Sequence, residues 1–317
     1  MRRLQHQPWL RRGIQLVIIL VPLAYVVRSL IGNWQALSDY DWHLNVLRAA
    51  GALIALLLAR SLLGVASQQA FSGLGYPIDS RAIFRGYHIS SLSMYLPGGL
   101  YVGRAVVFGE HGVDVVSSSI GVMIELSMLI LSGMLGSVPY LLVAGTGALS
   151  RFRTLGWMLI PLTLSVLYPG LTNRVLRWLL ARLGYEERGV NLTVRQLVNM
   201  LLLVTAYWLV AGVGFYLLVT SIYAVPSELF PVFASAFSLA RVATIVLSAT
   251  PGGLGVLEGA LALLLAPFLP APLPALVALL ARLWTTVALL ILFGLATLFG
   301  KNVRHTEVRV RGPLSEE

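Results

Sequence analysis

Charged side chains lie within long apolar stretches of this sequence, and these are the residues with the greatest capacity for chemistry. They are Arg104, Glu125, Arg241, Glu258 and Arg282, each with apolar sequence on both sides. A guanidinium can hold a phosphate through two parallel hydrogen bonds, whereas a carboxylate can neutralise an arginine, bind an amine or carry a proton. The pattern therefore predicts either a binding site for an anionic group or a structural network of ion pairs.

Two copies of a Pro-Gly-Gly triplet stand beside these charges. The first is Pro97-Gly98-Gly99, with Arg104 seven residues after its proline, and the second is Pro251-Gly252-Gly253, with Glu258 at the same offset. Proline removes a backbone donor and glycine opens backbone angles that are closed to other residues, so each triplet breaks a helix. Gly255 belongs to the second break. Broken backbone can present amide groups and a helix N-terminus to an anion, and we expect Arg104 and Glu258 to converge as a complementary pair.

Signatures of catalysis are sparse. The sequence has no HExxH, GxSxG or phosphate-binding P-loop pattern, no carboxylate pair with metal-ligand spacing in an apolar stretch, and no cysteine. His88 lies shortly before the first break, where it is more typical of a polar cavity lining than of a catalytic base. We therefore expect a protein that is not an enzyme and that needs no metal or cofactor. An enzyme acting on a lipid headgroup, with His88 and Glu258 as acid and base, is an alternative.

Composition indicates what kind of element must position these residues. Of the 317 residues, 57% are hydrophobic and 11% are charged, whereas a soluble domain carries about 25% charged residues. Mean hydropathy is +0.83. Several uncharged stretches approach or exceed the roughly 20 residues that cross a hydrocarbon core of about 30 Å. The sequence therefore predicts an all-α polytopic membrane protein.

Hydropathy divides the chain into six full spans and two broken segments. The broken segments cover about 84–108 and 230–269, and the spans are expected near 14–32, 45–66, 117–144, 154–171, 196–222 and 275–299. If each broken segment is a re-entrant hairpin, the halves 14–144 and 154–300 have the same order of elements with opposite orientation, which is an inverted repeat. Eight ordinary spans with Gly-Gly kinks are the alternative.

The distribution of basic residues predicts the orientation in the membrane. All but one of the 23 basic residues are arginines, the exception being Lys301, and the formal net charge is +10. They concentrate at the N-terminus, in 172–195 and in the tail 301–317, which we expect at the cytoplasmic face of the cell (inner) membrane. Segment 171–189 alternates leucines and arginines at helical spacing, which predicts an amphipathic helix at that interface. The charge is thus explained by anionic lipid, and nucleic acid is not an expected partner.

The ends of the expected spans account for other arginines. Arg28 and Arg48 lie near span ends, where their side chains can reach the headgroups, and Arg60 is also expected near the cytoplasmic face. Residues 1–300 are then one transmembrane domain.

At its two motifs the sequence resembles the lysylphosphatidylglycerol synthase transmembrane-region family. The resemblance rests on Leu96-Pro97-Gly98-Gly99 followed by Gly103-Arg104, and on the segment from Pro251 to Ala260, and it covers nearly the whole chain in motif order and hydropathy. Tyr101 departs from the pattern, which often has a small residue there. In the best-known members this domain is fused to an aminoacyltransferase and is credited with moving the aminoacylated lipid between leaflets. Only 17 residues follow Gly300, so we expect no lipid aminoacylation by this chain.

The resemblance implies a flippase-like translocator of phospholipids or lipid-linked amphiphiles. In this interpretation Arg104 holds a headgroup phosphate near mid-membrane, and Arg241 or Arg282 assists. Glu258 pairs with an arginine in the empty site or binds an amino or sugar group, and Glu125 or Glu258 carries any coupling proton. Membrane lipids are then the partners. A membrane subunit that recruits a glycosyltransferase or synthase through the basic loop and tail is a further alternative.

Overall fold

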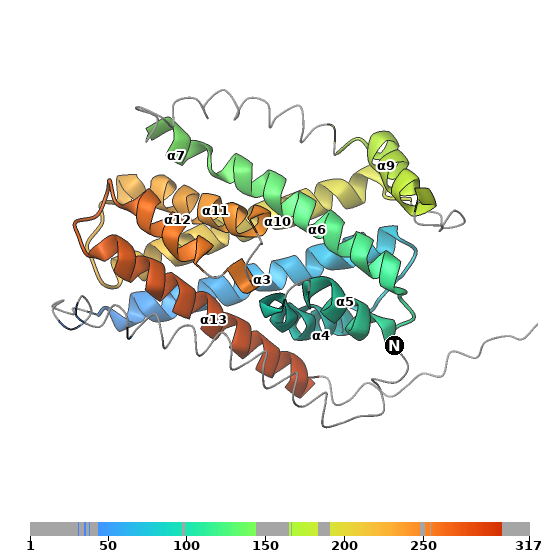
Figure 1. Ribbon diagram of the computed structural model, residues 1–317, viewed down its shortest axis with the longest axis horizontal. Helices are drawn as coiled ribbons and strands as arrows, with labels where there is room; N and C mark the ends of the chain where they lie inside the picture. Colours follow the sequence, from blue (N-terminus) through green and yellow to red (C-terminus); the bar gives the residue numbers. More distant parts are fainter. Residues whose placement is uncertain are drawn as a thin grey trace, which may run out of the picture.

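A computed structural model shows an all-helical protein (Figure 1). It describes residues 44–96, 99–143, 167–182, 191–247, 251–253 and 255–299, with isolated positions at 31, 35, 38 and 165. These residues contain no strand, which confirms the all-α class. The span expected at 14–32, most of that at 154–171, the tail 301–317, Pro97 and Gly98 lie outside the described residues.

Five helical stretches in the described part of the chain are long and apolar enough to cross a membrane. Four of them contain the long helices α3 (Val46–Gly73), α6 (Val115–Gly136), α10 (Val194–Thr220) and α13 (Leu273–Phe299), with α6 extended by α7 (Val138–Val143). These four match the spans predicted at 45–66, 117–144, 196–222 and 275–299, as expected of a multi-pass membrane protein. The fifth stretch, Ser227–Val246, also qualifies by length, although the sequence placed it in the second broken segment.

Polar caps set where three of the long helices begin. Asn45 accepts a hydrogen bond from the backbone of α3, and Asp114 accepts two from the backbone of α6. Thr193 and Gln196 form a reciprocal capping box at the start of α10. Each cap provides an acceptor for N–H groups that have no partner inside the helix.

The first broken segment is a pair of short helices. Helix α4 (Ser80–Ser91) continues into the 3₁₀ helix η2 (Leu92–Tyr95), and α5 (Gly99–Gly109) follows the break. Helices α4 and α5 pack against one another. Glycine permits this close approach, because a Cβ on Gly86 would meet the ring of Phe108 and one on Gly103 would meet Ser93.

The second broken segment also folds into two helices that pack together. Its first part is η3 (Ser227–Leu229) with α11 (Phe230–Val246), and its second part is α12 (Val256–Leu265). Between them, η4 (Pro251–Gly253) has backbone angles outside the helical range. Gly252, Gly253 and Gly255 have φ of 62°, 65° and 84°. Only glycine adopts such angles without a steric cost, so these glycines hold the chain in a non-helical conformation just before α12 begins.

The two broken segments meet inside the bundle. Figure 1 shows α4 and α5 in one half of the bundle and α11 and α12 in the other, along its longest axis. Their breaks, η2 and η4, contact one another. Tyr95 packs so closely on Gly252 that a Cβ there would overlap its ring. Breaks whose prolines are 154 residues apart in the sequence are therefore neighbours in space.

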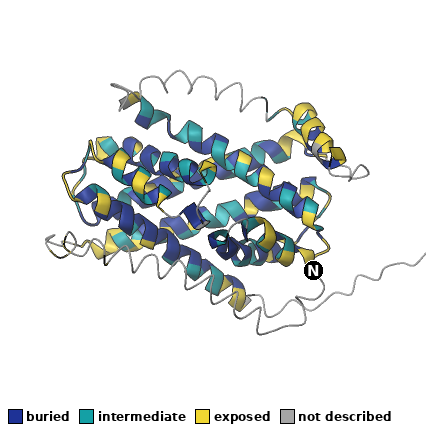
Figure 2. Ribbon diagram, viewed as in Figure 1, coloured by how far each residue is buried: buried dark blue, intermediate teal, exposed yellow. Residues whose placement is uncertain are grey.

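The core lies between the long helices and the second broken segment (Figure 2). Phe215 of α10 stacks on Phe237 of α11, with ring centroids 5.1 Å apart, and Trp284 of α13 meets Phe237 edge-on. These rings tie α11 to two long helices. The second broken segment is therefore anchored in the core.

Helix α9 (Pro169–Arg182) corresponds to the predicted amphipathic helix. Leu176 and Leu180 are buried, whereas Trp178 is exposed. The Asn173 side chain bonds to the N–H and carbonyl of Leu192, which fixes the helix to the residues just before α10. Helix α9 lies at the same end of the molecule as α4 and α5 (Figure 1).

Candidate functional site

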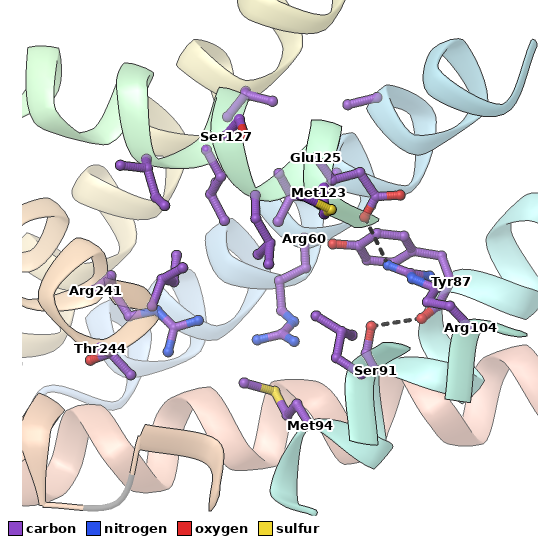
Figure 3. A pocket seen from close by; sticks show the side chains of 18 of the residues that line it. Arg60, Tyr87, Ser91, Met94, Arg104, Met123, Glu125, Ser127, Arg241 and Thr244 are labelled. Carbon is purple, nitrogen blue, oxygen red and sulfur yellow. Dashed lines mark hydrogen bonds and ion pairs between the residues drawn. The ribbon is translucent and has the colours of Figure 1, made fainter. Parts of the chain in front are cut away.

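A cavity of about 530 Å³ lies where the two breaks approach the long helices. Its volume is in the range of about 300–1,000 Å³ that small-molecule sites occupy. Both breaks contribute to its wall, through Gly99 from the first and through Gly252 and Gly253 from the second. Its charged lining residues are Arg60, Arg104, Glu125 and Arg241 (Figure 3).

Arg104 is held in one corner of the cavity by partners at both of its terminal nitrogens. Its Nη2 donates to Oε2 of Glu125 at 3.2 Å, and its Nη1 donates to Oγ of Ser90 at 3.0 Å. The guanidinium lies 3.8 Å from the centre of the Tyr87 ring, and Ser67 donates to the other oxygen of Glu125. Arg104 is 1% exposed. Each charge of this pair is neutralised by the other, and the stacking on Tyr87 adds a favourable cation–π contact.

Arg282 and Glu258 form a second pair, which braces the second break. Nε of Arg282 lies 3.3 Å from Oε1 of Glu258, and Nη1 donates to the carbonyl of Gly252 at 3.1 Å. The other carboxylate oxygen of Glu258 accepts from the N–H of Gly255 at 2.9 Å, at the start of α12. This pair lies outside the cavity lining. It links α13 to the irregular backbone of the second break.

Arg60 and Arg241 carry positive charge without an acidic partner among the described residues. Arg60 extends from α3 and Arg241 from α11, and Figure 3 shows the two side chains pointing toward one another across the cavity. Nε of Arg60 is buried and has no hydrogen-bond partner in the part of the chain that is described. This pair of like charges is the most unusual feature of the cavity, because a low-dielectric setting strengthens their repulsion.

Hydroxyl groups and apolar side chains make up the rest of the wall. The hydroxyls belong to Tyr87, Ser91, Tyr101, Ser127, Tyr207 and Thr244, and the apolar residues include Met94, Met123 and Met200. The lining residues exposed at the molecular surface are Tyr101 of α5 and Met123 and Ser127 of α6. Beside them Val102 and Val106 are also exposed. The cavity therefore reaches a largely apolar surface.

His88 does not line the cavity. It is fully buried on α4, where the rings of Phe84 and Tyr87 meet it edge-on with centroids 4.5 and 5.2 Å away. Neither ring nitrogen has a hydrogen-bond partner among the described residues. No group of three or more potential metal ligands occurs in the described ranges. His88 and Glu258 both stand apart from the cavity wall, so the acid–base alternative gains no support from the geometry.

The structure brings together three of the six charged or histidine residues expected at the site, namely Arg104, Glu125 and Arg241. The expectation that Arg104 and Glu258 form a complementary pair is wrong, because Arg104 pairs with Glu125 and Glu258 pairs with Arg282. Both acids therefore have arginine partners.

Arg60 is the charged residue of the cavity lining that the sequence reasoning did not assign to the site. It was expected near the cytoplasmic end of its span, but α3 continues to Gly73 and places Arg60 in the middle of a long helix. The residues 67–73 continue the helix although they are less apolar than the predicted span. Recognising this longer helix in the sequence would have placed Arg60 near its middle.

No protein-family model, no curated protein and no solved structure matches this chain. Functional inference therefore rests on the cavity and on the residues around it.

Proposed function

We propose that this protein translocates a lipid, holding the anionic headgroup of the substrate in the cavity between the two breaks. The observation that carries the proposal is the pair Arg60 and Arg241, two positive charges without an acidic partner among the described residues in a cavity of about 530 Å³. Ionisable residues within membrane segments are costly and mark substrate pathways. An anionic headgroup between the two guanidiniums would neutralise them and take up bidentate hydrogen bonds.

The apolar mouth of the cavity supports a lipid as the ligand. Tyr101 and Met123 line the cavity and are also exposed at the surface, beside exposed valines of α5. A headgroup would exchange its water shell for arginine and hydroxyl groups inside, while its hydrocarbon chain stayed in the bilayer. This separation avoids the large cost of moving a charged headgroup through hydrocarbon.

The two broken segments also suggest how the chain is arranged in the membrane. We propose that α4 and α5 enter and leave the membrane at the cytoplasmic face, on the side of α9, and that α11 and α12 enter and leave at the opposite face. The contact between η2 and η4 supports this arrangement, and irregular backbone at membrane depth is tolerated where it lines a cavity. The halves would then be inverted repeats, with the site at their junction. The motifs at both breaks make membership of the lysylphosphatidylglycerol synthase transmembrane-region family part of the same proposal.

Reconstitution tests the translocator. The protein is placed in phosphatidylcholine liposomes with a trace of fluorescent phosphatidylglycerol, phosphatidic acid or phosphatidylcholine, and transfer to the outer leaflet is followed by chemical quenching. We expect faster transfer of the anionic lipids, with the rate reduced about tenfold or more by Arg60→Gln or Arg241→Gln because each removes a charge-assisted contact. Arg174→Gln on α9 is the matched control, since Arg174 is exposed. Equal rates in protein-free and protein-containing liposomes for all anionic lipids would contradict the proposal.

Product analysis separates the translocator from a headgroup enzyme. Purified protein is incubated with the same lipids and the extract is examined by mass spectrometry. We expect every lipid to be recovered unchanged. A new headgroup product that disappears in the His88→Gln or Glu258→Gln variant would favour the enzyme instead.

A further inference from the structure

The charges that line the cavity leave an excess of two positive charges. Arg60, Arg104 and Arg241 face a single acid, Glu125, among the described lining residues. Glu125 is already paired with Arg104, so the excess resides on Arg60 and Arg241. We propose that the site selects a headgroup with at least two negative charges, that is, a phosphomonoester or a diphosphate on a hydrocarbon chain. This inference rests on the proposed function, because it names the substrate class of the same cavity.

Electrostatics favours a dianion over the headgroups of most phospholipids. Two guanidiniums that share a low-dielectric cavity repel one another, and an uncompensated charge there has a large desolvation cost. A phosphodiester lipid brings one negative charge and would leave one arginine uncompensated. A zwitterionic lipid brings no net charge. A phosphomonoester, whose second pKa is about 6, neutralises both arginines at pH 8.

The geometry provides two separate guanidinium groups for such a ligand. Arg60 belongs to α3 and Arg241 to α11, and both extend into the cavity from different walls (Figure 3). A guanidinium presents parallel N–H donors, so each arginine can hold one edge of a phosphate group or one phosphate of a diphosphate. The hydroxyl of Tyr207 lines the same cavity and can donate a further hydrogen bond, whereas that of Thr244 already donates to the carbonyl of Ala240.

Arg104 is excluded from the count because its charge is already paired with Glu125. It bonds to Glu125 and Ser90 and stacks on Tyr87. Recruiting it would leave the carboxylate of Glu125, which is 12% exposed, without its arginine. The two remaining arginines therefore set the charge that the ligand must match.

The test compares headgroups that differ in charge. Wild-type protein in phosphatidylcholine nanodiscs at pH 8 is titrated with phosphatidic acid, farnesyl diphosphate and phosphatidylglycerol at one fixed salt concentration, with binding measured by native mass spectrometry. We expect phosphatidic acid and farnesyl diphosphate, which each carry at least two negative charges at pH 8, to bind at least about tenfold more tightly than phosphatidylglycerol, since they gain at least one more charge-assisted contact. At pH 5 phosphatidic acid carries about one charge, and we expect its advantage to disappear. Equal affinity of phosphatidic acid and phosphatidylglycerol at pH 8 would overturn the inference.

Variants assign the selectivity to the two arginines. We expect Arg60→Gln and Arg241→Gln each to reduce the preference for phosphatidic acid over phosphatidylglycerol to about threefold or less, while Arg174→Gln keeps it. Arg60→Lys keeps the charge but loses the bidentate geometry, so it should retain part of the preference. Thermal unfolding of each variant shows that it is folded. A preference that survives both glutamine substitutions would overturn the assignment.

Free anions distinguish a lipid from a soluble ligand. Inorganic phosphate and pyrophosphate are added as competitors against farnesyl diphosphate. We expect competition only at concentrations far above those of the lipid, because the hydrocarbon chain contributes to binding. Pyrophosphate that binds as tightly as farnesyl diphosphate would overturn the lipid part of the inference.

The translocator and the preference for a doubly charged headgroup can be contradicted by different results. Transfer of phosphatidylglycerol at the same rate as phosphatidic acid, without a binding preference, contradicts the dianion inference and supports a translocator. A clear preference for dianions without any transfer contradicts the translocator and supports the site.

Discussion

Arg104 and Arg282 are almost inaccessible, at 1% and 3% exposure, and each has a carboxylate within ion-pair distance. Arg60 and Arg241 have the same chemistry and no acid beside them in the described part of the chain. Residue type alone therefore does not distinguish an arginine that stabilises the fold from one that is available to bind a ligand. The neighbouring side chain does, because a buried charge must be compensated either by the protein or by a ligand.

Loss of Arg282 is expected to destabilise the protein strongly. In Arg282→Met the carboxylate of Glu258 loses its arginine and the carbonyl of Gly252 loses its donor. Breaking one side of a buried ion pair typically costs about 3–5 kcal/mol. Thermal unfolding in detergent measures the change, and the double variant Arg282→Met, Glu258→Gln should recover part of the loss. If the single variant were as stable as wild type, the pair would not brace the break.

Removal of the single acid of the cavity lining should strengthen anion binding. Glu125→Gln keeps the size of the side chain but takes away its negative charge, so Arg104 becomes a third available cation. We expect affinity for phosphatidic acid to rise about threefold to tenfold in the nanodisc titration. Ser67→Ala is the control, since it removes a hydrogen bond to Glu125 without a change of charge. Weaker binding by Glu125→Gln would indicate that its main role is to position Arg104.

At the scale of the elements, glycine permits the irregular backbone of the second break and the close packing around it. The backbone of Gly252 and Gly253 has positive φ, and both residues are buried. A Cβ on Gly253 would overlap the side chain of Thr244, and one on Gly252 would overlap Tyr95. The same two residues form part of the cavity wall. Backbone conformation, helix packing and the shape of the site therefore depend on the same atoms.

Alanine at these glycines should destabilise the break. We expect Gly252→Ala and Gly253→Ala each to cost about 1–3 kcal/mol, because alanine at positive φ is strained and its Cβ has no space. Thermal unfolding in detergent measures the effect. Gly259→Ala and Gly294→Ala are matched controls within helices, where no atom lies within 4 Å of the added Cβ. These control substitutions should stabilise the protein by about 0.5–1 kcal/mol. Equal changes in stability for the break variants and the control variants would argue against a strained break.

For the whole molecule, the decisive relation is between the two broken segments. They approach from opposite halves of the bundle and touch at η2 and η4 (Figure 1). By length alone Ser227–Val246 qualifies as a span, yet its continuation packs back against it as α12.

Labelling of single cysteines tests this topology, since the natural chain has no cysteine. Arg81→Cys and His111→Cys lie at the two ends of the first broken segment, and Glu228→Cys and Ala271→Cys at the ends of the second. All four positions are exposed. With a membrane-impermeant maleimide, we expect the first two to react from the cytoplasmic side and the last two from the other side. Reaction of Arg81→Cys and His111→Cys from opposite sides would show that the first broken segment crosses the membrane.

The sequence by itself determined the helical class, four of the long apolar helices, both breaks and the charged residues worth attention. These features are local, because hydrogen bonding within a helix and the backbone freedom of glycine depend on residues close together in the chain. Only the tertiary structure decided that Arg104 meets Glu125, that Arg282 meets Glu258, and that Arg60 and Arg241 are left without an acid in the described bundle. Charge compensation acts over a few ångströms between helices that are distant in sequence, so partners are set by packing and not by spacing along the chain.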